Sequence, residues 1–214
     1  MTNVFCHIAI SLDGYAAGPN QSKDNPLGEG GMRLHEWTVK TASWREQHAL
    51  EGGERNPSSA VIEEVVENVG AYIMGRNMFD HGRGDWDPDW RGWWGDDPPF
   101  HTPVFVLTHR ERASIQMERG TTFHFMDASP AHALQAAREA ANGRDVRIGG
   151  GATTIREFLA AGLIDHMEVV VVPIVLGRGV RLWDGLEGLE KDYQIEAVSS
   201  PSGVTHITFV RAAQ

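Results

Sequence analysis

Residues 146–155 read Val146-Arg-Ile-Gly-Gly-Gly-Ala-Thr-Thr-Ile155, a short apolar strand that leads through three glycines into a helix. Glycine has no side chain, so a ligand can approach the backbone closely there, and the N–H groups at the start of a helix attract anions. Three consecutive glycines exceed what a tight turn requires, and we therefore predict a phosphate-binding segment. The alternative is a strand-to-helix turn without a ligand.

This glycine run departs from the usual dinucleotide fingerprint. If Gly149 and Gly151 are aligned with the first two glycines of that fingerprint, Thr154 stands where the third should be. Asp165 and Glu168 lie before or within the next apolar strand, whereas the fingerprint has its acidic residue at the end of that strand. Both departures argue against a Rossmann domain.

Two other strands also end in groups that can bind phosphate. Tyr72-Ile-Met-Gly-Arg-Asn-Met-Phe79 places Gly75 and Arg76 after an apolar strand, and Val104-Phe-Val-Leu-Thr-His-Arg110 ends in hydrogen-bond donors. Ligands of open α/β sheets bind at the carboxyl ends of the strands, where an arginine can grip a phosphate such as the 2′-phosphate of NADP. Taken alone, Arg76 can also be a surface arginine after a turn. Three such strand ends on one edge of a sheet favour the ligand.

Strands and helices alternate along most of the chain, which indicates a parallel sheet flanked by helices. The predicted strands cover residues 4–12, 71–75, 104–107, 121–125, 146–148 and 167–172. The predicted helices cover residues 34–50, 57–69 (ended by Gly70), 153–161, and a segment that starts at Ser129-Pro130 and stops at Asn142-Gly143. Residues 193–198 and 204–211 predict a terminal hairpin. We expect one α/β domain over residues 1–214, with a mixed, mostly parallel sheet and an antiparallel hairpin at its C-terminal end.

Charge and composition narrow the classes of function. The 214 residues carry 19 basic and 29 acidic side chains, a formal net charge of −10, which disfavours binding to nucleic acid. The single cysteine, Cys6, cannot form an internal disulfide and is expected to be a small buried hydrophobe. The N-terminus lacks the basic region of a signal peptide, and no apolar run reaches the ~20 residues that span a membrane. We therefore expect a soluble cytoplasmic protein that binds neither nucleic acid nor membrane.

The motifs, taken in chain order, resemble those of the dihydrofolate reductase fold. They are a strand with Met74-Gly-Arg76, a strand with Leu107-Thr-His-Arg110, and Ile148-Gly-Gly-Gly151 before a helix. Ser11-Leu-Asp-Gly14, Gly162-Leu-Ile-Asp165 and Pro173-Ile-Val-Leu-Gly-Arg-Gly179 narrow the resemblance to the reductase domain of riboflavin biosynthesis and its uncharacterised relatives. The resemblance covers nearly the whole chain, and it is more specific for the fold and the cofactor than for the substrate.

That resemblance implies hydride transfer from NADPH. Residues 149–153 would cradle the pyrophosphate, residues 76–78 would meet the adenosine phosphates, residues 108–110 would lie beside the 2′-phosphate, and the Ala9-Ile10 backbone would hold the nicotinamide carboxamide. The cofactor-binding residues so implied are Ala9, Ile10, Gly75, Arg76, Asn77, Met78, Thr108, His109, Arg110, Ile148, Gly149, Gly150, Gly151, Ala152 and Thr153.

The hydride acceptor is implied less specifically, as a small heterocycle of pterin or pyrimidine type. Arg33, Trp37, Trp93 and Arg178 are the candidate substrate-binding residues. Asp13 is the candidate catalytic residue because it follows the strand expected to floor the active site; the alternative is that it shapes an Asp-Gly turn. Two other functions stay open, namely 5-amino-6-(5-phosphoribosylamino)uracil reductase activity and a non-catalytic module that binds NADPH or a pterin. The resemblance also makes a homodimer the expected assembly.

The tryptophan-rich segment, residues 83–99, has three interpretations. It can be a lid that stacks on a flat substrate, a dimer contact, or a loop held in place by its own aromatic side chains. Asp85, Asp87 and Asp89 have the alternate spacing of a calcium loop, but Trp90 replaces the required glycine, so an acidic solvated loop is the better interpretation. The ten histidines are scattered, and we predict no metal site.

Overall fold

The structure, a computed structural model, describes residues 2–47, 50–64, 68–81 and 84–212. The chain divides into two compact units. The first holds the residues up to 6, residues 22–26 and residues 68–165, and the second holds residues 7–21, 27–67 and those from 166 onward. Strand β1 (Val4–Ser11) contributes its residues up to Cys6 to the first unit and the remainder to the second.

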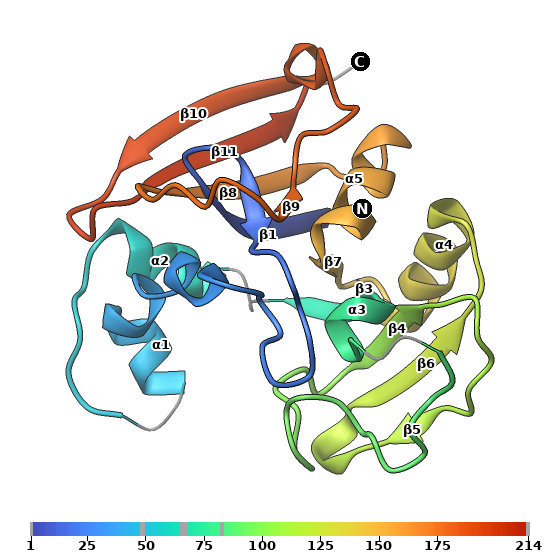
Figure 1. The fold of residues 1–214 in the computed structure, drawn as a ribbon. Helices are drawn as coiled ribbons and strands as arrows, with labels where there is room; N and C mark the ends of the chain where they lie inside the picture. Colours follow the sequence, from blue (N-terminus) through green and yellow to red (C-terminus); the bar gives the residue numbers. More distant parts are fainter. Residues whose placement is uncertain (1, 48–49, 65–67, 82–83, 213–214) are drawn as a thin grey trace. The chain divides into compact units, whose positions relative to one another are not determined.

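The first unit is built on a mostly parallel sheet with the strand order β1-β7-β3-β4-β6-β5 (Figure 1). The strands after β1 are β3 (Val69–Gly75), β4 (Pro103–Leu107), β5 (Ile115–Gln116), β6 (Thr122–Met126) and β7 (Asp145–Gly150). Strands β1, β7, β3, β4 and β6 pair in parallel, whereas β5 pairs antiparallel with β6. Residues 69–74 of β3 are all buried, as expected of a strand covered on both faces.

The helices of the first unit pack against this sheet. They are α3 (Arg76–Phe79), α4 (Pro130–Ala141) and α5 (Ala152–Ala160), with a short 3-10 turn η3 (Glu118–Gly120). Helix α4 lies on β3, β4 and β7, and α5 lies on β7 and β3. The predicted start of α4 is confirmed, because the Ser129 hydroxyl accepts a hydrogen bond from His132 N and Pro130 is the first helical residue. Its predicted stop is confirmed by the left-handed conformation of Asn142 (φ 51°).

The second unit contains the C-terminal hairpin. Strands β10 (Tyr193–Ser199) and β11 (Thr205–Arg211) pair antiparallel along their whole length, and β11 also pairs antiparallel with β8 (His166–Val172). A separate short ladder joins β2 (Tyr15–Ala17) to β9 (Val180–Arg181), and a 3-10 turn η4 (Leu189–Asp192) precedes β10. The predicted fold class, a mixed and mostly parallel sheet with flanking helices and a C-terminal antiparallel hairpin, is confirmed.

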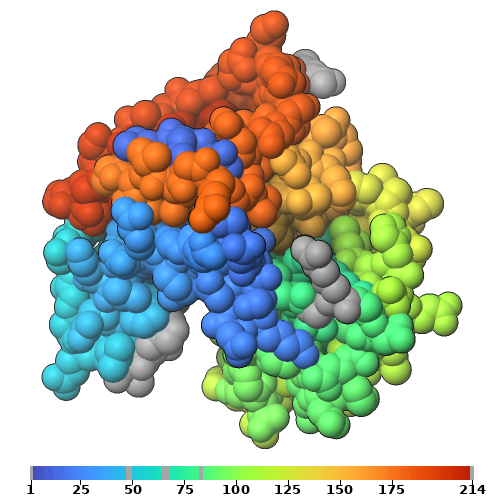
Figure 2. Space-filling view, viewed as in Figure 1, coloured from blue at the N-terminus to red at the C-terminus, as the bar shows by residue number. Residues whose placement is uncertain are grey.

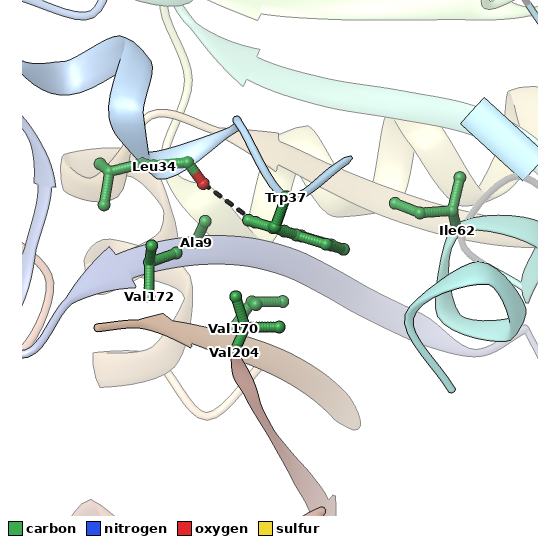
Figure 3. Close-up of a cluster of buried hydrophobic side chains, with 7 residues drawn as sticks. All are labelled: Ala9, Leu34, Trp37, Ile62, Val170, Val172 and Val204. Atoms are coloured by element: carbon green, nitrogen blue, oxygen red, sulfur yellow. Dashed lines mark hydrogen bonds between the residues drawn. The ribbon is translucent and has the colours of Figure 1, made fainter. Parts of the chain in front are cut away.

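The hydrophobic core of the second unit forms around Trp37. Figure 3 shows its ring among Ala9, Leu34, Ile62, Val170, Val172 and Val204. The ring Nε1 donates a hydrogen bond to Leu34 O at 2.9 Å, so the polar edge of the indole is satisfied inside the core. Burial of this ring fixes the segment before the first helix against β1 and β8.

The prediction of one helix over residues 34–50 is wrong. The structure has two 3-10 turns, η1 (Gly31–Leu34) and η2 (Thr38–Lys40), followed by helix α1 (Ala42–Gln47). Thr41 is extended (φ −77°, ψ 145°) and forms a β-bridge with Glu54, and this non-local pairing interrupts the helix. Residues 48 and 49 lie outside the described part of the chain.

The predicted helix over residues 57–69 is shorter than expected. Helix α2 (Pro57–Glu64) begins as predicted, and residues 65–67 lie outside the described residues. Val69 and Gly70 belong to β3 instead. A Cβ at Gly70 would stand 2.5 Å from Ala141 O, so this glycine is required by close packing against the end of α4 and does not end a helix. Among the helices in the described residues, none has both the length and the apolar character needed to cross a membrane.

Candidate functional site

The three strand ends singled out by the sequence lie side by side in the first unit. Strand β3 is flanked by β7 and β4, and all three run parallel. Gly75 is paired with Leu107, and Met74 is paired with Gly150. The glycine run, Gly75-Arg76 and the segment after Leu107 therefore follow one another along a single edge, as predicted.

The glycine run joins β7 to α5. Gly150 has a φ of +121°, the Gly150–Gly151 peptide bond is cis, and Gly151 is the residue before the helix. No side chain caps α5, and its first intrahelical hydrogen bond runs from Ile155 N to Gly151 O. The N–H groups of the first helical turn have no partner inside a helix, so they are donors for an anion at this end.

Two of the three glycines are not explained by the packing of the chain itself. A Cβ at Gly151 would meet no atom of the described residues within 4 Å, and Gly151 has an ordinary φ of −69°. A Cβ at Gly149 would make ordinary van der Waals contacts, the nearest at 3.6 Å to Ile73 O. The space beside Gly151 is open, so a group that must approach the backbone and the helix terminus fits there.

Gly75 is required by the packing of the chain itself, and its predicted contact with the cofactor stays a prediction. A Cβ at this position would lie 2.4 Å from the Thr154 hydroxyl oxygen, so the end of β3 and the first turn of α5 pack too closely for a side chain. Thr154, which is buried, is a residue of the site that sequence reasoning missed. Its signal is its place at the third glycine position of the dinucleotide fingerprint. Met78, which follows on α3, has its sulfur beside the glycine run, 3.6 Å from where a Cβ of Gly150 would stand.

Arg76 is held by the tryptophan-rich segment. Its guanidinium lies 4.1 Å from the centroid of the Trp86 ring and donates a hydrogen bond to Gly84 O at 2.8 Å. The Arg112 guanidinium lies 4.9 Å from the same ring, so two arginines contact one indole. Burial lowers the pKa of Arg112, and the Arg76 charge adds to that shift, while Asp80 and Asp87 oppose it. Arg112 was not predicted, since its place follows only from tertiary packing.

The segment after β4 carries two basic side chains, each paired with an acid. Thr108 is buried, and its hydroxyl accepts a hydrogen bond from Arg110 N. His109 Nδ1 lies 2.9 Å from Asp127 Oδ1, and Arg110 Nη1 lies 2.5 Å from Asp85 Oδ1. The predicted donors are thus present at the edge, in contact with carboxylates.

The described residues of the tryptophan-rich segment form a loop pinned by its own aromatic rings. Trp90 Nε1 donates to Phe79 O at 2.8 Å, Trp94 stacks on Phe123, and Trp93 lies 4.6 Å from Trp90. In Figure 2 this segment, coloured green, lies on the surface of the first unit, and residues 82 and 83 are outside the described part. The third interpretation describes this packing, and the roles of lid, dimer contact and substrate contact for Trp93 stay predictions. The described residues contain no group of three or more His, Cys, Asp or Glu that could hold a metal ion.

In the second unit, Asp13 binds backbone N–H groups. Its Oδ1 accepts from Leu176 N at 3.1 Å and its Oδ2 accepts from Gly177 N at 2.6 Å. The Ser11 hydroxyl and these two amides lower the pKa of Asp13 from 3.8 to about 2. An acid of this strength is ionised at neutral pH and cannot donate a proton there. Gly14, with a φ of +84°, completes the Asp-Gly turn, so the turn-shaping alternative describes the contacts observed.

The other candidates of the second unit have separate environments. Ala9 and Ile10 are buried on β1, and Trp37 is only 4% exposed in the core. Arg33 is exposed at the end of η1, and Arg178 pairs with Glu29 at 3.2 Å on the surface. Trp37 therefore has the position of a core side chain. The predicted substrate contacts of these residues stay predictions.

Comparison with known proteins gives the family context of this site. The family model described as the RibD C-terminal domain matches residues 2–205. A curated relative, the uncharacterised protein YwjB of Bacillus subtilis (strain 168), is 22% identical over 96% of both chains. The match supports the riboflavin-reductase branch of the resemblance.

Solved structures share the fold. A crystal structure described as a riboflavin biosynthesis protein of Shewanella sp. PV-4 aligns over 99% of this chain and 100% of that one, with a TM-score of 0.57 and 24% identity. A diaminohydroxyphosphoribosylaminopyrimidine deaminase/5-amino-6-(5-phosphoribosylamino)uracil reductase from Thermotoga maritima aligns over 99% of this chain but 57% of its own length, with a TM-score of 0.56 and 14% identity. At these identities the likeness establishes the fold alone, and it confirms the dihydrofolate reductase-like fold predicted from the motifs.

Proposed function

Because this chain belongs to the family of the RibD C-terminal domain, we propose that it is an NADPH-dependent reductase of a small pyrimidine-type heterocycle. The proposal rests on membership of the family together with the edge formed by β7, β3 and β4 in the first unit. The name of the Thermotoga maritima protein joins a deaminase to a uracil reductase, and this chain is similar to 57% of that protein. The chain has a single cysteine, so it lacks the cysteine pair of zinc deaminases, and reduction is the proposed chemistry.

The observation that carries the proposal is the open space beside Gly151. Nothing in the described chain requires glycine there, yet the residue precedes an uncapped nine-residue helix at the carboxyl end of a parallel strand. A phosphate group is the ligand whose charge and size suit helix N–H donors that no side chain covers. The residues present therefore fit the diphosphate of a dinucleotide.

Each part of the edge has a proposed task in holding the cofactor. The backbone of residues 149–153 would donate to the pyrophosphate, and residues 76–78 would meet the adenosine phosphates. Residues 108–110 would lie beside the 2′-phosphate, where Arg110 has the planar donor set suited to phosphate. NADPH, when bound, supplies the hydride.

Within the second unit, Asp13 fixes a loop of the chain. Asp13 holds the backbone of Leu176 and Gly177 as an ionised acceptor, so we assign it a positioning task. Because the pKa of Asp13 is about 2, a proton needed by the acceptor must come from another group or from solvent.

The test uses Gly151→Ala against the parent protein. An added Cβ has room and suits the φ of −69°, so the variant should fold with unchanged or slightly higher stability. It should nevertheless bind NADPH at least about tenfold more weakly, as measured by isothermal titration calorimetry, because a methyl group would stand where the phosphate approaches. Unchanged affinity would remove the glycine run from the site.

An assay of catalytic turnover distinguishes between the remaining candidate functions. Consumption of NADPH should be followed with 5-amino-6-(5-phosphoribosylamino)uracil, unphosphorylated pyrimidines and dihydropterins. Reduction of a pyrimidine supports the proposal, and reduction of pterins alone contradicts the pyrimidine class. Binding of NADPH without turnover on any of these compounds would favour the non-catalytic module.

A further inference from the structure

The segment Gly84-Asp85-Trp86 contacts both arginines of the proposed phosphate edge. Gly84 O accepts from Arg76, the Asp85 carboxylate pairs with Arg110, and the Trp86 ring stacks on the Arg76 guanidinium. Trp86 Nε1 also donates to Arg110 O at 3.3 Å. These contacts tie one short segment of the loop to the arginines that follow two different strands.

We propose that Asp85 is a specificity-determining residue that competes with the 2′-phosphate of the cofactor for Arg110. This inference rests on the proposed function and adds to it a residue that lowers the preference for a phosphorylated ribose. A carboxylate and a phosphate oxygen are acceptors for the same guanidinium N–H groups, so an N–H that donates to Asp85 does not donate to a phosphate at the same time. The carboxylate also repels a phosphate dianion placed next to it.

The ion pair between Asp85 and Arg110 is exposed, so Asp85 can be replaced by another anion. The Asp85 side chain is 97% exposed and that of Arg110 is 48% exposed, so the carboxylate can turn into water when another anion arrives. Trp86 keeps the adjoining backbone beside Arg110 through its indole N–H, so Asp85 stays close to the site after the pair opens. Asp85 therefore lowers the affinity for the phosphate without blocking the edge.

Asp127 pairs with His109 in the same way as Asp85 pairs with Arg110, the next residue along the chain. Its carboxylate lies 2.9 Å from His109 Nδ1, and it follows β6, the strand next to β4. This carboxylate thus occupies a ring nitrogen of His109 at the same end of β4. Two separate segments thus present an acid to the predicted 2′-phosphate residues.

The experiment compares two small probes that differ in the 2′-phosphate. Calorimetry at low salt should give the dissociation constants of 2′,5′-ADP and 5′-AMP for the parent protein, Asp85→Asn and Asp127→Asn. Asp85→Asn should tighten 2′,5′-ADP by about two- to fivefold, the range of an exposed ion pair, and leave 5′-AMP unchanged. Asp127→Asn should act in the same direction, because it removes the carboxylate beside His109.

The matched control is Asp97→Asn. It makes the same charge change in the first unit, but its carboxylate contacts His101 and Arg119. The ratio of the two dissociation constants should stay at the parent value in this variant.

Three results would overturn the inference. They are an unchanged affinity of Asp85→Asn for 2′,5′-ADP, equal tightening of both probes, and an Asp97→Asn variant that matches Asp85→Asn. If the parent protein binds NADPH while Asp85→Asn leaves the ratio unchanged, the inference alone fails. If the parent protein binds neither probe nor NADPH, the nucleotide site itself is refuted and the inference falls with it.

Discussion

At the residue scale, two glycines on the candidate edge are glycines for different reasons. Gly75 has no room for a Cβ because the Thr154 hydroxyl oxygen is 2.4 Å from that position. A Cβ at Gly151 would meet no atom of the described chain within 4 Å, so we attribute this glycine to the approach of a ligand. The sequence alone cannot separate these cases, because the Thr154 hydroxyl that decides the case of Gly75 lies about 80 residues away along the chain.

Cys6 is a small buried hydrophobe, as predicted. It lies on β1 beside β7, and burial raises the pKa of its thiol to about 12.

A residue-scale prediction concerns Asp13 and pH. Because its folded pKa is about 2 and its ordinary value is 3.8, the unfolded chain binds more protons between these values, and folding stability rises with pH across that window. The contribution of Asp13 is fully present above pH 3.8 and is lost as the pH falls through about 2. Urea unfolding from pH 2 to pH 5 should show a shallower pH dependence for Asp13→Asn than for the parent protein. Parallel curves would contradict the assigned hydrogen bonds to the 176–177 backbone.

At the element scale, local chemistry fixed the ends of some helices and distant contacts fixed others. Helix α4 carries its start signal in Ser129-Pro130 and its stop signal in Asn142-Gly143, so both ends could be predicted. The segment 34–50 has no such signals, and its break at Thr41 depends on Glu54, which the sequence does not connect to it. The adjacency of the strand ends could be predicted, because parallel βα units place these ends on one edge. The positions of Asp85 and Arg112 could not, since each reaches the edge through packing, whereas Thr154 had a signal in its place at the third glycine position.

A buried polar network joins four elements of the second unit. Ser58 Oγ at the start of α2 lies 2.8 Å from His206 Nε2 on β11, and His206 Nδ1 lies 3.0 Å from Glu168 Oε1 on β8. Ser58 also contacts Ser200 and Ser202 in the turn between β10 and β11. The order Ser-His-Glu is that of an acyl-transfer triad, but Ser58 is wholly buried and three partners fill its one donor and two acceptor positions. We therefore interpret the network as structural.

That interpretation gives an element-scale prediction. Ser58→Ala should lower the free energy of unfolding by about 1–3 kcal/mol, because it leaves a buried imidazole nitrogen without its hydroxyl partner. The matched control is Ser114→Ala, which removes the same kind of contact, Ser114 Oγ to His124 Nδ1 at 3.0 Å, from an exposed site. The control should change the free energy by no more than about 0.5 kcal/mol. Equal effects of the two variants in urea titrations would show that the network adds nothing beyond a surface hydrogen bond.

At the scale of the whole molecule, the charge and the proposed ligand have the same sign. The chain carries a formal charge of −10, so its overall field repels NADPH, and attraction must come from donors gathered at one place. The edge of the first unit provides helix N–H groups and arginines, and one of these, Arg110, is paired with the acidic side chain of Asp85. This arrangement would favour binding of one anion over general affinity for polyanions.

The corresponding prediction is that NADPH, the proposed cofactor, stabilises the protein. Ligand that binds the native state at about 100 times its dissociation constant adds about 2.7 kcal/mol to the free energy of unfolding. For a chain of this length that amounts to a rise in Tm of about 5–11 °C. Differential scanning calorimetry should show this rise with NADPH for the parent protein, and a smaller one for Gly151→Ala at the same NADPH concentration.

The control is the Tm without ligand. The two proteins should then have nearly equal Tm, because the added methyl group of Gly151→Ala meets no atom of the described chain. An equal rise for both proteins would place the bound cofactor away from the glycine run, and a lower Tm of unliganded Gly151→Ala would show that glycine is needed there by the fold itself.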